Sequence, residues 1–354
     1  MTAQTSRYRS RPEPSATVLR IAKIVRSPKS VFGGIRQLPI FIAASTLAVC
    51  CMASPAAAAI SCTISMTNVA FSSIDVLPGS PIDTTGTATI NCSGLNANTT
   101  YRFCTDIRSG TDVSGNQRRM ASGTNTLNFD LYKDSAHTQQ WGNYSSNFLG
   151  GGSQNDFTSN ASGNIVNATI TVFGRVPGAQ QTAPPGSYSE SMTSGTTNDL
   201  QYGALSSGGN CPVGNKTASY SFTVTATVVS SCNVSATTHN FGSTLTLSSN
   251  VDATSTVTAT CTSTTPYNIG LDAGTGSGAT VTTRKMTSGS HTINYSLYTN
   301  SARTTVWGNT VGTNTVSGTG TGAAQNVTAF GRVPSQTTPP PATYSDTIVT
   351  TVTY

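Results

Sequence analysis

Cysteine is the residue type whose chemistry and spacing are most informative in this 354-residue chain, which contains eight of them. Cys50 and Cys51 lie in an N-terminal apolar run, and the others are spread over the rest of the sequence. An even number of cysteines with no Cys-x-x-Cys pair is typical of a disulfide framework in an exported protein. The six candidates are Cys62, Cys92, Cys104, Cys211, Cys232 and Cys261.

Sequence separations suggest how these cysteines pair. Two pairs have matched separations of 30 and 29 residues, Cys62 with Cys92 and Cys232 with Cys261, which predicts one equivalent bridge in each half of the chain. The remaining two cysteines would form a third bridge, in the first half alone. Spacing does not fix connectivity, so other pairings stay open.

Other residues with catalytic or metal-binding chemistry form no group. The histidines His137, His239 and His291 are scattered, so we expect no zinc site. No Gly-x-Ser-x-Gly motif and no pair of carboxylates stands out. We therefore expect neither an enzyme nor a bound cofactor.

The start of the chain has the pattern of a secretory signal peptide. Residues 1–37 hold eight of the 19 Lys and Arg residues and one acid. An apolar run over 38–52 and the small residues Ala56–Ala59 follow, as hydrophobic core and cleavage signal. The alternatives are a membrane anchor, for which the run is short, and a lipoprotein, for which Val49 is the wrong residue before the modified cysteine.

Removal of residues 1–59 changes what the charge implies. The whole chain has a net charge of +6, but residues 60–354 carry eleven bases and twelve acids. Binding to nucleic acid needs clustered cations. The adjacent pair Arg118-Arg119 is expected at a solvated strand end or turn, so we expect no nucleic-acid partner.

Composition indicates an all-β protein. Only 9% of residues are charged and 36% are hydrophobic, while Thr, Ser, Asn and Gly dominate the remainder. Thr favours strands, and Gly and Asn favour turns. This composition excludes a charge-rich helical bundle and a chain kept disordered by its charge.

An internal repeat divides the mature chain into two domains. We place domain one at 60–229 and domain two at 230–354, with an insertion near 193–219 in the first. Period-two alternation and frequent turn residues predict β-sandwiches. We expect the recurring Trp141 and Trp307 to pack in the core or at an edge. The matching blocks are 127–143 with 293–309, 173–177 with 330–334, 188–190 with 344–346 and 118–120 with 284–286.

These blocks resemble the spore coat protein U (SCPU) domain, which also forms the subunits of archaic (Csu-type) chaperone–usher pili. The motifs are two cysteines some thirty residues apart, Leu-Tyr-x-[Asp/Asn]-Ser-Ala ending in Trp-Gly, Phe-Gly-Arg-Val-Pro, and a closing Tyr-Ser-[Asp/Glu] with an alternating strand. They cover nearly all of the mature chain, twice.

The resemblance implies two immunoglobulin-like β-sandwiches in tandem. The C-terminal one would be an incomplete pilin fold that awaits a donor strand from an adjacent pilin subunit. The implied partners are a periplasmic chaperone and an outer-membrane usher, and the implied location is an extracellular pilus. Only Ile60 and Ser61 precede Cys62 after the predicted cleavage. Such a subunit accepts a strand but does not donate one, which predicts a position at the tip.

The segment between the domains has two interpretations. Residues 219–229 could be the last strand of domain one, matching 344–354. They could instead be an extension of domain two that acts in cis as a donor strand for domain one.

A tip subunit of this kind implies attachment to an abiotic or host surface, and biofilm formation, through apolar loops of domain one. We expect the three loops 74–79, 147–152 and 199–205 to cluster at one end, and the best candidate is 199–205, because domain two lacks it. The alternative is that these side chains pack into the core. The candidates are Val76, Leu77, Phe148, Leu149, Leu200, Tyr202 and Leu205.

Two other functions remain open. A carbohydrate-binding lectin on the same sandwich would need a polar pocket with an aromatic floor. A structural coat protein would have no ligand site at all.

Overall fold

The computed structural model of the protein describes residues 59–144, 148–192, 199–205 and 218–354. Residues 1–58, which hold nearly all of the predicted signal peptide, and Cys211 lie outside these ranges. The described chain forms strands and one short 3-10 helix, η1 (Phe148–Gly150), which confirms the all-β prediction. In this part of the chain no helix has the length and apolar character needed to cross a membrane.

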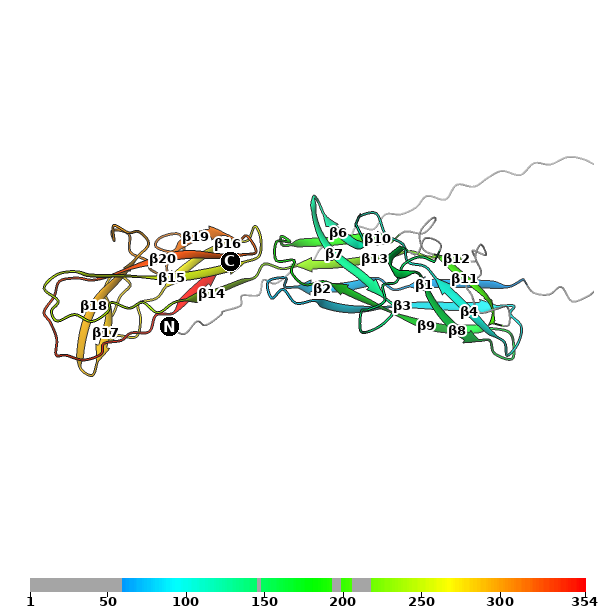
Figure 1. Ribbon diagram of the computed structural model, residues 1–354, viewed down its shortest axis with the longest axis horizontal. Coiled ribbons are helices and arrows are strands. Elements are labelled where there is room, and N and C mark those ends of the chain that lie inside the picture. The colour runs from blue at the N-terminus through cyan, green and yellow to red at the C-terminus, as the bar shows by residue number, and fades with distance from the viewer. Residues whose placement is uncertain (1–58, 145–147, 193–198, 206–217) are drawn as a thin grey trace, which may run out of the picture. The chain divides into compact units, whose positions relative to one another are not determined.

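Strand pairing among the described residues falls into two sets, which we call the N-terminal and the C-terminal sandwich (Figure 1). The strands of the N-terminal sandwich are β1 (Ser61–Met66), β2 (Val69–Ile74), β3 (Ile82–Ser93), β4 (Thr100–Thr105), β5 (Val113–Ser114), β6 (Gln117–Ser122), β7 (Asn125–Tyr132), β8 (Ser153–Thr158), β9 (Ile165–Val176), β10 (Gly186–Met192), β11 (Asp199–Ala204), β12 (Ala218–Ser219) and β13 (Phe222–Val228). Those of the C-terminal sandwich are β14 (Cys232–Ala236), β15 (Val251–Cys261), β16 (Pro266–Leu271), β17 (Arg284–Ser288), β18 (His291–Tyr298), β19 (Val316–Thr319), β20 (Ala324–Val333) and β21 (Thr350–Thr353).

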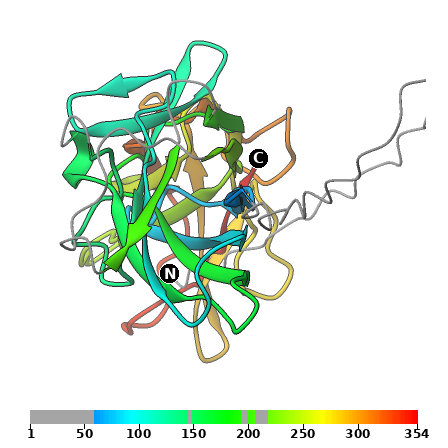
Figure 2. The ribbon, with the colours of Figure 1, turned by 90° about the vertical axis from the view of Figure 1, so that its right-hand side faces the viewer.

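Two sheets enclose the core of the N-terminal sandwich. One has nine strands in the order β1-β3-β9-β7-β6-β10-β13-β2, with β5 beside β6, and the other has the order β12-β11-β4-β8. Strand β2 is the last strand of the nine-stranded sheet, yet it contacts β3, which is the second strand from the opposite edge. This sheet therefore curls back on itself, and Figure 2 gives the end-on view. Alternating burial along β13 is the period-two pattern expected of a strand with one face in a core.

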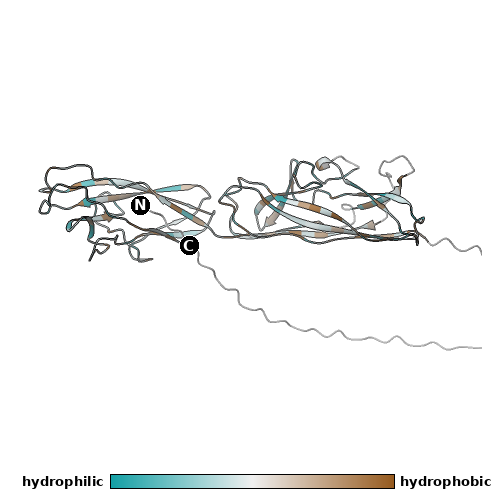
Figure 3. Cartoon of the chain, turned by 90° about the horizontal axis from the view of Figure 1, so that it is seen from below, coloured by the Kyte–Doolittle hydropathy of each residue, from teal (hydrophilic) through white to brown (hydrophobic). Residues whose placement is uncertain are grey.

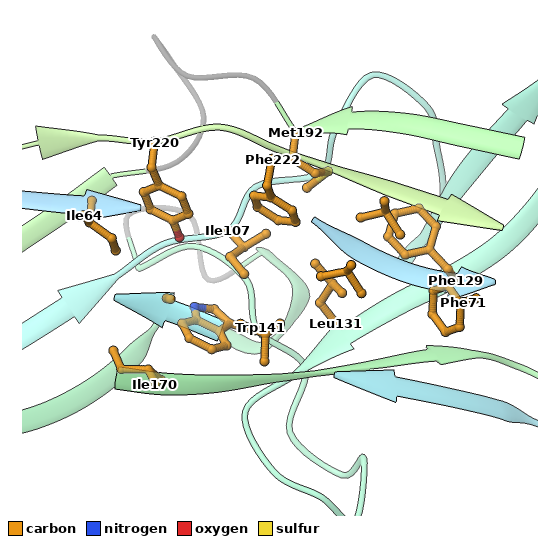
Figure 4. Packing of buried hydrophobic residues seen from close by; sticks show 14 of the residues in the cluster. Ile64, Phe71, Ile107, Phe129, Leu131, Trp141, Ile170, Met192, Tyr220 and Phe222 are labelled. Carbon is orange, nitrogen blue, oxygen red and sulfur yellow. The ribbon is translucent and has the colours of Figure 1, made fainter. Parts of the chain in front are cut away.

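Trp141 lies in the core of the N-terminal sandwich. Its side chain is fully buried, and its indole Nε1 donates a hydrogen bond to the carbonyl of Thr105 over 2.8 Å. Figure 4 shows the ring among Ile107, Ile170 and Tyr220. The prediction that the recurring tryptophans are packing residues is confirmed, because Trp307 is equally buried in the other sandwich.

The C-terminal sandwich repeats this plan with fewer strands. Its sheets have the orders β14-β15-β20-β18-β17 and β19-β16-β21. In Figure 3 the apolar stretches of both sandwiches are short and interrupted by polar residues along the strands.

The tryptophan hydrogen bonds align one sandwich with the other. In the N-terminal sandwich the acceptor of the indole bond, Thr105, pairs with Leu200 of β11. In the C-terminal sandwich the acceptor, Ile269, pairs with Val352 of β21. Strand β21 is therefore the equivalent of β11.

This equivalence corrects two predictions. The match of 219–229 with 344–354 is wrong, because β13 has no counterpart among the described residues of the C-terminal sandwich. The segment 199–205 is also not a loop that domain two lacks, since 199–204 is β11. Backbone pairing with β4 holds residues 199–204 as a strand, and pairing with β16 holds β21 in the same way. The end of the chain therefore matches β11 and not β13.

Candidate functional site

Strand β13 completes the N-terminal sandwich by lying between β10 and β2. It runs antiparallel to β10 and parallel to β2, so that Val224 lies opposite both Glu190 and Val69. Its core-facing side chains are buried at 5% exposure or less, and they are Phe222, Val224, Ala226 and Val228. The strand is thus an integral part of this sheet.

The C-terminal sandwich has both flanking segments but, in its described residues, no strand between them. Residues 239–244 correspond to β2, because Thr237 and Thr256 repeat the mutual hydrogen bonds that precede β2. Residues 342–348 correspond to β10, because Tyr344 repeats the bond of the β10 tyrosine to a proline carbonyl. One isolated bridge, Thr287↔Ser345, attaches this second segment to its sheet.

Burial differs accordingly. Val69, Phe71 and Ile74 of β2 are all buried beside β13. At the equivalent positions His239 and Phe241 are half-buried and residue 244 is exposed. Unpaired strand edges that border apolar side chains are templates for another strand. We call the two segments 239–244 and 342–348 the open edges.

His239 brings an ionisable group to an open edge. Its ring packs over Gly331, where a Cβ would lie 2.1 Å from Nε2. Nδ1 lies 2.8 Å from Oγ of Ser255, whereas Nε2 is buried without a hydrogen-bond partner. Burial lowers the pKa of His239 to about 4, and the charge of Arg303 adds to this effect, so the ring is neutral at physiological pH.

The sequence interpretation of the histidines missed this site. Val69 and Gly86 occupy the equivalent positions in the N-terminal sandwich, where a Cβ on Gly86 would lie 2.9 Å from Cγ2 of Val69. The two halves therefore differ in a matched way, an apolar side chain over glycine in one and a histidine bonded to serine in the other. Comparing offsets from both cysteines of each half would have found the pair, because Val69 and His239 each follow the first cysteine by seven residues and Gly86 and Ser255 each precede the second by six.

Arg118 is not at a solvated strand end, contrary to the prediction. Its side chain is fully buried and pairs with Asp130 over 2.7 Å. Carbonyl groups of Ile107, Arg108 and Trp141 accept its other hydrogen bonds. A buried cation is stable only when acceptors satisfy its hydrogen-bond donors. The Arg-Arg pair in the sequence did not reveal that Arg118 has these acceptors. Neighbouring Arg119 pairs with an aspartate at the surface.

Two disulfides link the paired strands that begin each sandwich. Cys62 is bonded to Cys92 across β1 and β3, and Cys232 to Cys261 across β14 and β15. Cys104 is disulfide-bonded as well. Its predicted partner, Cys211, lies outside the described residues.

Four of the predicted surface residues are in the core: Val76, Leu77, Leu149 and Leu200 are at most 9% exposed. The prediction that they form an exposed apolar patch is wrong. The Asp75 carboxylate accepts from the Leu77 N–H and holds a tight turn that directs both apolar side chains inward. Leu149 lies in η1, and Leu200 faces the core from β11.

The three predicted loops also do not gather at one end. The turn after β2 follows the pair Ile74↔Val228, at the end where β13 finishes. Leu205 follows the pair Ala204↔Tyr101, at the end where β4 starts. The side chain of Phe148 lies outside what the structure describes.

Two predicted residues keep exposed surface. Tyr202 is half-buried, with its ring stacked 5.8 Å from that of Phe103. Leu205 is 37% exposed. Two further apolar residues, Ile60 and Val166, are exposed. Ile60 precedes the pair Ser61↔Ser93, and Val166 follows the pair Cys92↔Ile165. Strand β4 begins shortly after Ser93. Ile60, Val166 and Leu205 therefore belong to one end of the N-terminal sandwich, which we call the apolar end.

A polar cleft of about 400 Å³ opens elsewhere on the N-terminal sandwich. Its lining combines residues 124–128 with 179–184 and includes no aromatic side chain. It thus lacks the aromatic floor that a lectin site was expected to have. Among the described residues no three His, Cys, Asp or Glu side chains are grouped so as to hold a metal ion.

Comparison with protein families finds one match, the Spore Coat Protein U domain, over residues 47–195 and again over 218–351. No curated protein matches the sequence.

Solved structures with a similar chain path include two tip adhesins. One is the CsuC–CsuE chaperone–tip adhesion subunit pre-assembly complex of archaic chaperone–usher Csu pili from Acinetobacter baumannii, at 18% identity and TM-score 0.49, covering 83% of this chain and 100% of that one. The CupB6 tip adhesin from Pseudomonas aeruginosa has 10% identity and TM-score 0.34, covering 78% and 90%.

Proposed function

Because the chain belongs to the spore coat protein U domain family, we propose that it is the two-domain tip subunit of an archaic chaperone–usher pilus. The pilus attaches cells to surfaces and supports biofilm formation. The subunit is exported by a cleaved signal peptide, a periplasmic chaperone holds it, and an outer-membrane usher assembles it. The N-terminal sandwich is the adhesin domain and the C-terminal sandwich is the pilin domain.

One observation carries this proposal: the open edges of the C-terminal sandwich flank the position that β13 fills in the N-terminal sandwich. A strand from an adjacent pilin subunit fills this position in the assembled pilus. Burying apolar side chains like those of β13 contributes about 1.5–3 kcal/mol for each large one. The gain of a ladder of backbone hydrogen bonds adds to this and makes the junction strong.

The position of β13 supports the second of the two interpretations of the interdomain segment. β13 ends four residues before Cys232, where a pilin carries its donor extension, and it completes the preceding sandwich. The chain thus contains one covalent copy of a subunit–subunit junction, with domain two donating in cis to domain one.

Attachment is assigned to the apolar end, which presents Ile60, Val166 and Leu205. Their exposed fractions of 48%, 66% and 37% leave apolar area that contact with a surface would remove from water. Such contact needs no specific ligand chemistry.

Hydrogen exchange of the purified mature chain tests strand acceptance. We expect amides of β15 and β20 to exchange faster than those of β3 and β9, and to become protected when a donor-strand peptide is added. The N-terminal sandwich is the control within the same molecule, because β13 already completes it. Protection of β15 and β20 that is high without peptide and unchanged by peptide would contradict the proposal.

A further inference from the structure

The N-terminal sandwich shows what a strand in the position of β13 contacts as it leaves the sheet. Directly after β13, the backbone N–H of Val229 donates to the carbonyl of Ile74 over 3.0 Å. Two residues later, the hydroxyl of Ser231 donates to the Asp75 carboxylate over 2.8 Å. The residue that precedes Cys232, the first cysteine of the second half, therefore contacts the residue that follows β2.

Leu245 occupies the position of Asp75 in the C-terminal sandwich. Each lies thirteen residues after the first cysteine of its half. Three residues earlier, Ser72 and Gly242 both have a positive φ, of 57° and 77°. Two residues later, both halves have a leucine, and both leucines are buried. The match of Leu245 with Asp75 is therefore fixed on both sides.

The two positions differ in chemistry and in exposure. The Asp75 carboxylate accepts from the N–H of Leu77 and from Ser231, so both of its oxygens have partners. Leu245 has an apolar side chain that is 97% exposed, and it directly follows the open edge 239–244. One exposed leucine is ordinary on a protein surface. This leucine lies where the filled sandwich contacts the segment before a cysteine, and that contact identifies what would cover it.

We propose that Leu245 is a docking contact for the pilin subunit that completes the C-terminal sandwich, and that this pilin carries a large apolar residue directly before its first cysteine. The inference rests on the proposed function, because it describes the subunit that donates the strand. Polar atoms of the side chains at the two positions lie 2.8 Å apart in the filled copy, so the side chains are direct neighbours. An apolar side chain in place of the serine would cover Leu245 and remove both side chains from water.

This contact makes the two strand junctions of the chain different from each other. Serine satisfies Asp75 by a hydrogen bond, but it has little apolar surface with which to cover Leu245. A leucine in the same place covers Leu245, whereas beside Asp75 it would deprive the carboxylate of a hydrogen bond. Loss of the contact alone leaves the donated strand in place, so pili still assemble without it.

The test uses two peptides that differ at one residue. The first has the sequence of residues 219–231 of this chain, and the second carries Ser231→Leu. Both end in an amide, so that no terminal carboxylate lies beside Leu245. Fluorescence anisotropy measures their affinities for the purified mature protein. We expect the leucine peptide to bind about fivefold more tightly, the effect of removing about 40 Å² of apolar surface from water.

Leu245→Asp supplies the matched control, because it copies the residue that the N-terminal sandwich has at this position. Since the side chain of Leu245 is 97% exposed, the substitution leaves the core intact. In this variant the serine peptide should bind as tightly as the leucine peptide, or more tightly. Circular dichroism and thermal unfolding verify that the variant is folded.

Two kinds of result would overturn the inference, and they are distinguishable. Equal affinities of the two peptides for the unchanged protein, or a leucine preference that persists in Leu245→Asp, would overturn the contact with Leu245 while strand acceptance stands. Failure of both peptides to bind either protein would overturn strand acceptance, and the inference with it.

Discussion

Arg118 donates from Nη1 to Oδ1 of Asp130 over 2.7 Å, and both side chains are at most 1% exposed. The equivalent Arg284 is equally buried, but it donates from Nη1 to the carbonyl of Val281 over 2.9 Å. Ser296 takes the place of the aspartate and donates to the carbonyl of Thr282. One buried guanidinium is therefore held by a carboxylate and the other by backbone alone.

This difference predicts unequal sensitivity to substitution. Asp130→Ser leaves Nη1 of Arg118 without its partner and should destabilise the N-terminal sandwich by about 3–5 kcal/mol. Ser296→Ala removes one neutral hydrogen bond and should cost about 1 kcal/mol in the C-terminal sandwich. Hydrogen exchange of β9 and of β20 measures the two effects separately. Equal losses of stability would show that a carbonyl group accepts the hydrogen bond of Arg118 Nη1 when the Asp130 carboxylate is removed.

The low pKa of His239 predicts that the C-terminal sandwich loses stability on acidification. The folded pKa of about 4 lies below the usual 6.5, so the unfolded chain takes up a proton first as the pH falls. The contribution to stability is complete above pH 6.5 and is lost between 6.5 and 4. Because the ring is only partly buried, we expect a loss of about 2 kcal/mol.

Urea unfolding of the C-terminal sandwich between pH 4 and 7 measures this effect. The control is His239→Val, in which the dependence over this interval should be reduced by that amount. A pH dependence that is the same in both proteins would assign it to other groups.

Strand-level features were predictable from the sequence because local patterns determine them. The two tryptophans recur at one offset in the repeat, and apolar and polar residues alternate with period two in the sequence around them. Either copy therefore predicts strands with one buried face. The matched cysteine separations likewise pointed to the bridges now seen between β1 and β3 and between β14 and β15.

The site residues were harder to predict because their environment is made by distant segments. Leu200 lies among Asp, Gln and Gly, which suggested a loop, yet pairing with β4 makes it core. Alternation of Leu200, Tyr202 and Ala204 was the available signal. His239 acquires its significance from Ser255 on another strand and from a neighbouring strand that is missing. No local window of sequence contains that information.

The close contact between Gly86 and Val69 predicts that a serine at position 86, as in the His239–Ser255 pair, is not tolerated beside valine. A serine there would bring its Cβ to 2.9 Å from Cγ2 of Val69, and β-branched valine beside paired backbone has little freedom to move. We expect Gly86→Ser to destabilise the N-terminal sandwich by about 1–2 kcal/mol. Adding Val69→His should recover part of this loss, because it recreates the His239–Ser255 pair. Thermal unfolding of Gly86→Ser, Val69→His and the double variant measures the coupling, and purely additive losses would contradict it.

Attachment through the apolar end can be tested directly by substitution. Val166→Thr with Leu205→Ser removes apolar surface from two side chains that are 66% and 37% exposed, so the core should stay intact. Each exposed side chain contributes about 1–2 kcal/mol when a surface covers it. We therefore expect several-fold fewer piliated cells to remain on an apolar surface after washing, with the number of pili unchanged. The matched control is Leu245→Ser, which removes a 97% exposed leucine from the C-terminal sandwich and should leave attachment unaltered. Equal losses in the two variants would mean that exposed apolar area matters wherever it lies, and that the apolar end is not the attachment site.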